Sequence, residues 1–318
     1  MDDVQDSLTS KIKVLNEKIW ENRVPEPLIR EWLDNFRRSG AETAKERLHA
    51  LFMLSNMMYF GSKQMRELLR ALYRDLYRYP IIESIRRQHG DTTDEKLIGQ
   101  AFSDELQRTL FLGVGNPSES GCHLLYYFRQ ENGLSKAQFI HTHQIFHRDT
   151  NTGLLILRHP DVKRYVFIDD FCGTGKQGTE YSRDVVSDLK KLDATVVVAY
   201  YVLFATSDGI GRVQAEKRFD EVACIYELDS TFKCFDRDAR YFADPPAGIE
   251  KAFAEGMSRE YGLGLVPSHP LGYENCQLLI AFHHNTPDNT LPIIWYDEPS
   301  GAPWTPVFRR YPKYDGWV

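Results

Sequence analysis

Apolar residues are distributed differently in two parts of the chain. From Leu8 to about Gly113 they recur mainly at three- and four-residue spacing, the pattern of amphipathic helices. Beyond this part, short apolar runs rich in β-branched and aromatic residues alternate with helical segments. Strands that alternate with helices in this way predict an α/β fold, a doubly wound parallel sheet with right-handed crossovers. Its strands are expected at residues 109–115, 153–158, 164–169, 194–205 and 221–226.

We expect two domains. A helical N-terminal module covers residues 1–92, and the polar segment 89–95 links it to an α/β domain over residues 93–318. Three short helices followed by extended residues suit a winged-helix or helix-turn-helix arrangement. The first module is therefore predicted to be all-α and to be a candidate for binding a partner.

Four arginines recur at four-residue spacing on the third expected helix, over residues 62–79. A stripe of this kind would suit contact with a nucleic-acid backbone. The alternative, which is more common for charged runs, is a solvated face paired with neighbouring acids or a face that docks a protein. Residues 1–90 carry a net charge of +3 and the remainder −9, which permits an anionic partner for the first module without requiring one. The stripe consists of Arg66, Arg70, Arg74 and Arg78.

The composition predicts a folded cytoplasmic protein. Hydrophobic residues make up 42% and charged residues 26% of the sequence, which is typical of globular domains. The longest mainly apolar run, residues 194–205, is shorter than the roughly 20 residues of a membrane span, so no membrane contact is expected. The first residues lack the basic and apolar regions of a signal peptide. The five cysteines are scattered without paired spacing, as in reduced proteins.

The stretch over residues 164–178 carries the clearest chemical pattern. An apolar run ends in Asp169 and Asp170 and passes directly into a glycine- and threonine-rich turn before the next helix. In open α/β sheets, ligands bind beyond the carboxyl ends of the strands. Backbone N–H groups at a turn before a helix suit a phosphate, and the two carboxylates suit sugar hydroxyls. The predicted phosphate-binding residues are Gly173, Thr174, Gly175, Lys176 and Gln177.

Two alternatives exist for this stretch. The acid pair at the strand end would also serve to cap the following helix without binding a ligand. A Walker A loop fits poorly, because Asp170 stands where its first glycine is required and Gln177 replaces its Ser or Thr.

The stretch resembles the phosphoribosyl-diphosphate motif of type I phosphoribosyltransferases, in which an apolar strand leads to two acids and then to a Thr-Gly turn. Asp169, Asp170, Thr174 and Gly175 match that motif, and Lys176 lies where some purine-salvage members also carry Lys. Gly173 and Gln177 depart from it, with Gly173 in place of the acid that could serve as a general base in purine salvage. The resemblance therefore implies a ribose-phosphate site without that base.

The resemblance also implies roles for particular residues. Asp169 and Asp170 would engage the ribose hydroxyls directly or through Mg²⁺, and the turn at 173–177 would hold the 5′-phosphate. The turn after the expected strand at 109–115 resembles the pyrophosphate loop of these enzymes in position and in its small residues. The irregular segment around 227–272 would form the hood over the substrate. The pyrophosphate loop consists of Ser118, Glu119, Ser120 and Gly121.

The C-terminal part, over residues 285–310, looks like the ending of phosphoribosyltransferase-like effectors from bacterial conflict operons, including retron-associated ones, although a proline-rich hairpin would use the same residues. This resemblance implies a role in anti-phage defence. Three hypotheses follow: a transferase or glycosidic-bond-cleaving enzyme that uses phosphoribosyl diphosphate or a nucleotide with Mg²⁺, a catalytically silent nucleotide sensor that controls the helical module, and an interaction protein. For the third, the N-terminal helices would dock a reverse transcriptase and its nucleic acid.

Overall fold

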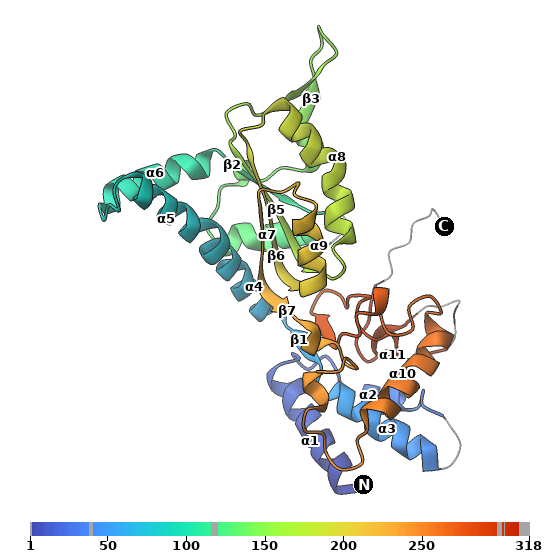
Figure 1. The fold of residues 1–318 in the computed structure, drawn as a ribbon. Helices are drawn as coiled ribbons and strands as arrows, with labels where there is room; N and C mark the ends of the chain where they lie inside the picture. The colour runs from blue at the N-terminus through green and yellow to red at the C-terminus, as the bar shows by residue number, and fades with distance from the viewer. Residues whose placement is uncertain (1, 38–40, 116–119, 298–300, 302, 312–318) are drawn as a thin grey trace. The chain divides into compact units, whose positions relative to one another are not determined.

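The computed structural model describes residues 2–37, 41–115, 120–297, 301 and 303–311. By their contacts, the residues form two compact units (Figure 1). One consists of Met1–Gln64 and Asp229–Val318, and the other of Met65–Leu228. This division differs from the expected boundary at residue 92, since residues 65–92 group with the sheet and residues 1–64 group with the C-terminal part.

The unit Met65–Leu228 contains a four-stranded, entirely parallel sheet, as predicted from the alternation of strands and helices (Figure 1). Its strands follow the order of the sequence, so each crossover leads to the neighbouring strand. Cys172, Ala205 and Glu227 are in register across the last three strands, close to their carboxyl ends. The strands are β2 (Thr109–Gly113), β5 (Arg164–Cys172), β6 (Val197–Thr206) and β7 (Glu221–Leu228).

Helices cover both faces of this sheet, because its strands alternate apolar side chains between the faces. On one face, Phe167 and Tyr200 are buried in a cluster with residues of α8 (Lys176–Leu192) and α9 (Ser207–Ala215). On the other, the Phe111 ring packs 5.3 Å from Phe128 of α7 (Ser120–Glu131) and 5.2 Å from Tyr77 of η1 (Leu72–Arg78). The sheet is thus doubly wound.

The remaining elements of this unit surround the sheet. Helix α4 (Ser62–Ala71), most of which belongs to the unit, continues through η1 into α5 (Tyr79–Gln88), and α6 (Glu95–Gln107) precedes β2. Asp94 caps α6, since its Oδ1 accepts N–H groups of Lys96 at 2.9 Å and Leu97 at 3.2 Å. Strands β3 (Phe146–Arg148) and β4 (Leu155–Leu157) pair as an antiparallel hairpin in the crossover between β2 and β5. The strand expected at 153–158 therefore exists as β4, but it is not part of the parallel sheet. Two 3₁₀ turns in the same crossover cover Lys136–Gln138 and Thr142–Gln144.

The other unit combines both ends of the chain around one apolar core that includes Trp20, Trp32 and Ile293. Trp32 Nε1 donates to the Ile293 carbonyl at 2.7 Å, which joins residues 261 positions apart. The apolar residues at 291–296 would suit a strand by their composition, but Pro292–Trp295 are helical. The elements are α1 (Asp2–Lys18), α2 (Glu26–Leu33), α3 (Ala41–Leu54), β1 (Met58–Phe60), α10 (Lys251–Leu265), β8 (Ile280–Phe282), α11 (Pro292–Trp295) and 3₁₀ turns at Ser230–Phe232, Arg240–Phe242 and Tyr273–Asn275.

The N-terminal residues are helical as predicted, but the short strand β1 pairs in parallel with β8 from the C-terminal part. The winged-helix arrangement stays a prediction. Within the described residues, no helix is both long enough and apolar enough to cross a membrane.

Candidate functional site

The predicted acid pair lies within β5, which continues through Cys172 instead of ending at Asp169. Neighbouring residues of a strand point to opposite faces of the sheet. Asp169 therefore shares the face of Tyr165 and Phe167, both buried in the cluster with α8, and it is only 4% exposed. Asp170 is 8% exposed. The two acids are thus nearly buried at the carboxyl end of an inner strand.

Asp169 is held by two hydrogen-bond donors. The Tyr200 hydroxyl donates to Asp169 Oδ2 at 3.0 Å, and the backbone N–H of Asp170 donates to Oδ1 at 3.0 Å. Burial raises the pKa of Asp169 well above its ordinary value, the neighbouring Asp170 carboxylate raises it further, and the Tyr200 hydrogen bond opposes the rise. The acid pair is therefore a site where negative charge is costly and where a cation or a hydroxyl donor would stabilise it.

Cys172 lies beside this pair but is not a reactive thiol. Burial raises the pKa of Cys172 to about 12, and the nearby Asp169 carboxyl adds to the rise. Because the thiolate is the nucleophilic form, a thiol with such a pKa is inert near neutral pH. Cys172 instead contributes to the apolar cluster under α8, where it is buried.

The glycine turn after β5 leads directly into α8. Gly175 is the N-cap residue of α8 with a φ of 73°, a left-handed conformation that glycine adopts without strain. The helix begins at Lys176, so Lys176 and Gln177 belong to its first turn. The first N–H groups of a helix have no acceptor inside the helix, and its N-terminus carries positive partial charge. This geometry suits an anion such as the predicted 5′-phosphate.

The junction between β6 and α9 supports this turn and was not predicted. The Thr206 hydroxyl donates to the Gly173 carbonyl at 2.5 Å and accepts the Gly209 N–H at 2.9 Å. Threonine is a common residue immediately before a helix, so the sequence contained a local signal for Thr206 as an N-cap. The contact of Tyr200 with Asp169 has no local sequence signal, because it depends on the register in which β5 and β6 pair.

The predicted pyrophosphate loop is only partly within the described residues. Ser118 and Glu119 lie outside them. Ser120 and Gly121 begin α7, which follows β2 as expected for this loop. Its role in binding stays a prediction.

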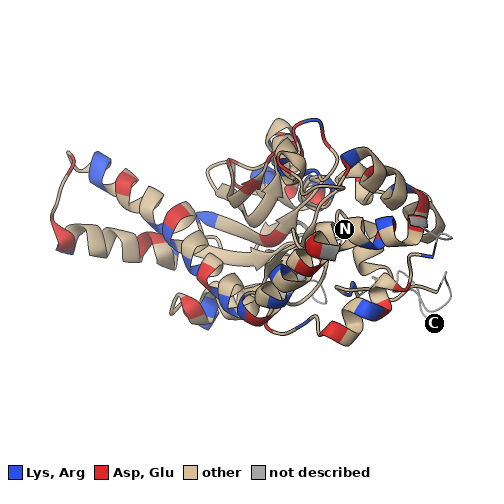
Figure 2. Ribbon diagram, turned by 90° about the horizontal axis from the view of Figure 1, so that it is seen from below, with Lys and Arg blue, Asp and Glu red and all other residues tan. Residues whose placement is uncertain are grey.

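The arginine stripe is engaged with acids and aromatic rings. Arg66 lies 2.7 Å from Glu131 and 4.2 Å over the Tyr127 ring, and Arg70 lies 2.6 Å from the same Glu131. Arg74 pairs with its neighbour Asp75 at 2.6 Å, and the Arg78 guanidinium lies 5.7 Å from the Phe102 ring centre. Figure 2 shows acidic residues beside basic ones along the helices. These contacts favour the alternative of a solvated face paired with neighbouring acids. Contact with nucleic acid stays a prediction.

The acid pair offers only part of the ligand set of a Mg²⁺ ion. Carboxylate oxygens are the ligands that Mg²⁺ prefers, and the ion usually keeps several waters. In the described part of the chain, no group of three or more His, Cys, Asp or Glu side chains is arranged to hold a metal. Asp169 and Asp170 therefore fit Mg²⁺ only as a site completed by phosphate oxygens and water.

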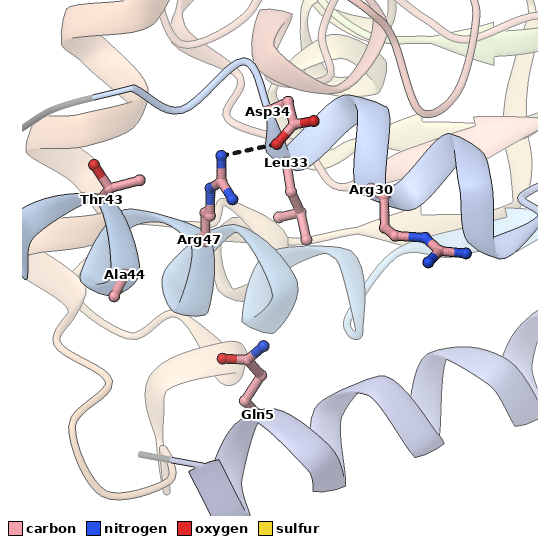
Figure 3. Close-up of a pocket in the computed structure, with 7 residues that line it drawn as sticks. All are labelled: Gln5, Arg30, Leu33, Asp34, Thr43, Ala44 and Arg47. Carbon is pink, nitrogen blue, oxygen red and sulfur yellow. Dashed lines mark hydrogen bonds and ion pairs between the residues drawn. The ribbon is translucent and has the colours of Figure 1, made fainter.

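A cavity of about 610 Å³ lies between α1, α2 and α3 (Figure 3). The Arg47 guanidinium on its wall pairs with Asp34 at 2.8 Å. All of its lining residues belong to the unit formed by the two ends of the chain, so it is not the predicted ribose-phosphate site. The lining consists of Gln5, Arg30, Leu33, Asp34, Thr43, Ala44 and Arg47.

The sequence matches the model of the PRTase-CE family over residues 29–310. No curated protein matches it significantly. Among solved structures, the AQ2163 protein from Aquifex aeolicus is 13% identical, with a TM-score of 0.30 over 65% of this chain and 86% of its own. Orotate phosphoribosyltransferase from Aeropyrum pernix is 15% identical (TM-score 0.25, 43% and 78% covered). Xanthine-guanine-hypoxanthine phosphoribosyltransferase from Helicobacter pylori is 8% identical (TM-score 0.29, 54% and 88% covered). Similarities with TM-scores this low carry no weight for the function.

Proposed function

The chain belongs to the PRTase-CE family of phosphoribosyltransferase-like proteins, and we propose that it binds phosphoribosyl diphosphate or a nucleotide together with Mg²⁺. The site lies at the carboxyl end of β5. The observation that carries this proposal is the direct sequence of an acid pair, a left-handed glycine turn and the N-terminus of a 17-residue helix. This sequence places hydroxyl acceptors next to N–H donors for a phosphate, which is the requirement of a ribose phosphate.

Each part of the site would bind one part of the ligand. Asp169 and Asp170 would accept hydrogen bonds from the ribose hydroxyls, and the backbone N–H groups at 173–177 would donate to the 5′-phosphate. Lys176 would add a positive charge at the first turn of α8. Mg²⁺, when bound, would neutralise negative charge on the diphosphate.

The chemistry of such a site needs no protein nucleophile. Displacement at the anomeric carbon develops positive charge on the ribosyl centre. The protein would accelerate it by positioning the ribose and by stabilising the leaving pyrophosphate. The reaction class is pentosyl transfer or cleavage of a nucleotide glycosidic bond.

A nucleotide sensor without turnover is the second candidate. Gly173 cannot supply a carboxylate at the turn, and an acid at this position would have been the nearest general base. In this case ligand binding would control the helices that precede the sheet.

We further propose that the protein acts in bacterial anti-phage defence, on the basis of its C-terminal sequence and the order of its segments. A reverse transcriptase with its nucleic acid is the proposed partner of the N-terminal helices. Co-purification of a reverse transcriptase encoded beside this protein would support this role, and a protein recovered alone at every salt concentration would contradict it.

Isothermal titration calorimetry with phosphoribosyl diphosphate and Mg²⁺ tests the ligand site. We expect saturable binding to the wild type and none to the double variant Asp169→Asn, Asp170→Asn. Asp188→Asn is the matched control, since this partly exposed acid on α8 pairs with Lys191 in the same helix. Unaltered binding in the double variant would refute the assignment.

Release of pyrophosphate separates the enzyme from the sensor. The wild type is incubated with phosphoribosyl diphosphate, Mg²⁺ and each nucleobase in turn, and separately with nucleotides. Turnover that the double variant lacks would identify an enzyme, whereas binding without turnover would identify a sensor.

A further inference from the structure

We propose that Thr206 is a positioning residue for the phosphate turn and acts through the carbonyl of Gly173. This inference rests on the proposed function, because it concerns the turn that would hold the 5′-phosphate. Thr206 ends β6 and is the N-cap residue of α9, and it is 5% exposed. It therefore belongs to a different strand, loop and helix from the turn that it contacts.

The Thr206 hydroxyl bonds to one backbone group of the turn after β5 and to one of helix α9. It donates to the carbonyl of Gly173 at 2.5 Å and accepts the N–H of Gly209 at 2.9 Å. A hydroxyl has one hydrogen and two acceptor positions, so both bonds form at once. Gly173 is buried, and its carbonyl needs a donor to avoid the cost of an unsatisfied buried group.

The two loops also approach too closely for side chains. A Cβ atom on Gly209 would lie 2.5 Å from the Gly173 oxygen and 2.7 Å from the Cys172 oxygen. A Cβ atom on Gly175 would lie 2.5 Å from the Gly209 oxygen. The backbone of the turn after β5 thus packs directly against the backbone at the start of α9. The Thr206 hydroxyl forms hydrogen bonds to both.

Because a peptide unit is planar, the contact of the Gly173 carbonyl also determines the direction of the Thr174 N–H. The carbonyl of Gly173 and the N–H of Thr174 belong to the same peptide and point in opposite directions when it is trans, and no described peptide bond is cis. Fixing the carbonyl toward Thr206 therefore aims the Thr174 N–H away from Thr206 and the start of α9. This N–H is one of the donors assigned to the 5′-phosphate.

The test compares Thr206→Val, which removes the hydroxyl at nearly constant shape, with Thr206→Ser, which keeps it. Thr290→Val is the matched control, since Thr290 is a fully buried threonine whose hydroxyl donates to the Ile280 carbonyl at 2.6 Å in the other unit. Affinities for phosphoribosyl diphosphate with Mg²⁺ and for ribose 5-phosphate alone are measured by calorimetry. We expect about tenfold weaker binding of both by Thr206→Val, recovery in Thr206→Ser and no change in Thr290→Val.

A second measurement does not depend on the ligand. Hydrogen exchange over residues 173–178 is expected to be faster in Thr206→Val than in the wild type and unchanged in Thr206→Ser and Thr290→Val. If Thr206→Val does not fold, Thr206→Gly is used, because Gly is tolerated at an N-cap position and has no hydroxyl to donate.

The outcomes separate the two proposals. Wild-type protein that binds neither ligand refutes the proposed function, and the exchange measurement then decides the role of Thr206 alone. Equal ligand affinity in wild type and Thr206→Val, or equal exchange over residues 173–178, overturns the role of Thr206. Weaker binding that Thr206→Ser does not restore also overturns it, since the effect would then come from shape and not from the hydroxyl.

Discussion

The hydroxyl of Tyr200 on β6 donates a hydrogen bond of 3.0 Å to Oδ2 of Asp169 on β5. Tyr200 is fully buried, and its ring stacks on Phe219 with 5.4 Å between ring centres. The first acid of the candidate site is thus oriented by a side chain from the neighbouring strand, on the face that α8 covers. The Tyr200 hydroxyl therefore contributes both to the stability of the fold and to the orientation of an acid in the proposed ligand site.

Replacing Tyr200 by Phe is expected to lower the free energy of unfolding by about 1–3 kcal/mol, because Asp169 loses a donor in a buried position. Urea denaturation at pH 7 measures the change. Tyr126→Phe is the control, since that exposed hydroxyl on α7 accepts only from Gln130 at 3.1 Å and should contribute little. Equal decreases in the free energy of unfolding in the two variants would show that the buried Tyr200 hydrogen bond stabilises the protein no more than an exposed one.

The stability of the Asp169→Asn variant relative to the wild type is expected to increase as the pH rises. Burial raises the pKa of Asp169 in the folded protein, so the folded state binds its proton more tightly than the unfolded chain. Stability from this group is therefore present at low pH and is lost as the pH rises from about 4, the pKa of an unperturbed Asp, through the folded value. Urea unfolding between pH 4.5 and 8 should show a growing advantage for Asn.

Asp193→Asn provides a control of opposite sign. Hydrogen bonds from Thr195 and Lys163 lower the pKa of Asp193 to about 2, so its contribution is present at neutral pH and is lost as the pH falls below about 4. A difference between Asp169→Asn and wild type that does not vary with pH would contradict the raised pKa.

His49 is expected to make the protein less stable as the pH falls below about 6.5. Its Nε2 accepts the backbone N–H of Glu250 at 2.9 Å, so Nδ1 carries the hydrogen and donates to the Lys45 carbonyl at 2.7 Å. Burial lowers the pKa of His49, and the folded protein therefore holds it neutral. Thermal unfolding at pH 5 to 7.5 should show a pH dependence that His49→Gln reduces and that the exposed His89→Gln keeps. An identical slope in His49→Gln would refute the prediction.

Two glycines of α9 are expected to respond oppositely to alanine. Gly209→Ala would place its Cβ atom 2.5 Å from the Gly173 oxygen, whereas a Cβ atom on Gly211 has nothing within 4 Å. We expect Gly209→Ala to cost about 3 kcal/mol or more and Gly211→Ala to stabilise by about 0.5–1 kcal/mol through helix propensity. Chemical denaturation measures both. A Gly209→Ala variant as stable as the wild type would contradict the close approach of α9 to the turn after β5.

The arginine stripe gives a separate prediction. If it contacts nucleic acid, replacing Arg66, Arg70, Arg74 and Arg78 by Ala should abolish the electrophoretic shift of a labelled oligonucleotide, with a loss that is strongest at low salt. Arg86→Ala with Arg87→Ala is the control in the same helical segment. An unchanged shift pattern would exclude the stripe as a nucleic-acid surface and leave its ion pairs with Glu131 and Asp75 as its role.

Local patterns in the sequence predicted the parallel sheet and the order of acids, glycine turn and helix at the end of β5. Apolar runs, turn residues and helix starts are properties of neighbouring residues, and these features depend on little else. The face on which Asp169 lies and its bond to Tyr200 depend on how two strands are paired, which one-dimensional patterns do not determine. The common core of residues 1–64 and 229–318 escaped prediction for the same reason, since contacts such as that of Trp32 with Ile293 have no local signature.

Hydrogen exchange with and without phosphoribosyl diphosphate and Mg²⁺ tests the location of the site most directly. The account predicts that the ligand slows exchange in peptides covering residues 169–178. Peptides from residues 30–47 that carry the cavity-lining residues Arg30, Leu33, Asp34, Thr43, Ala44 and Arg47 of the other unit should be unchanged. Protection confined to residues 30–47, or no protection over 169–178 at saturating ligand, would contradict it.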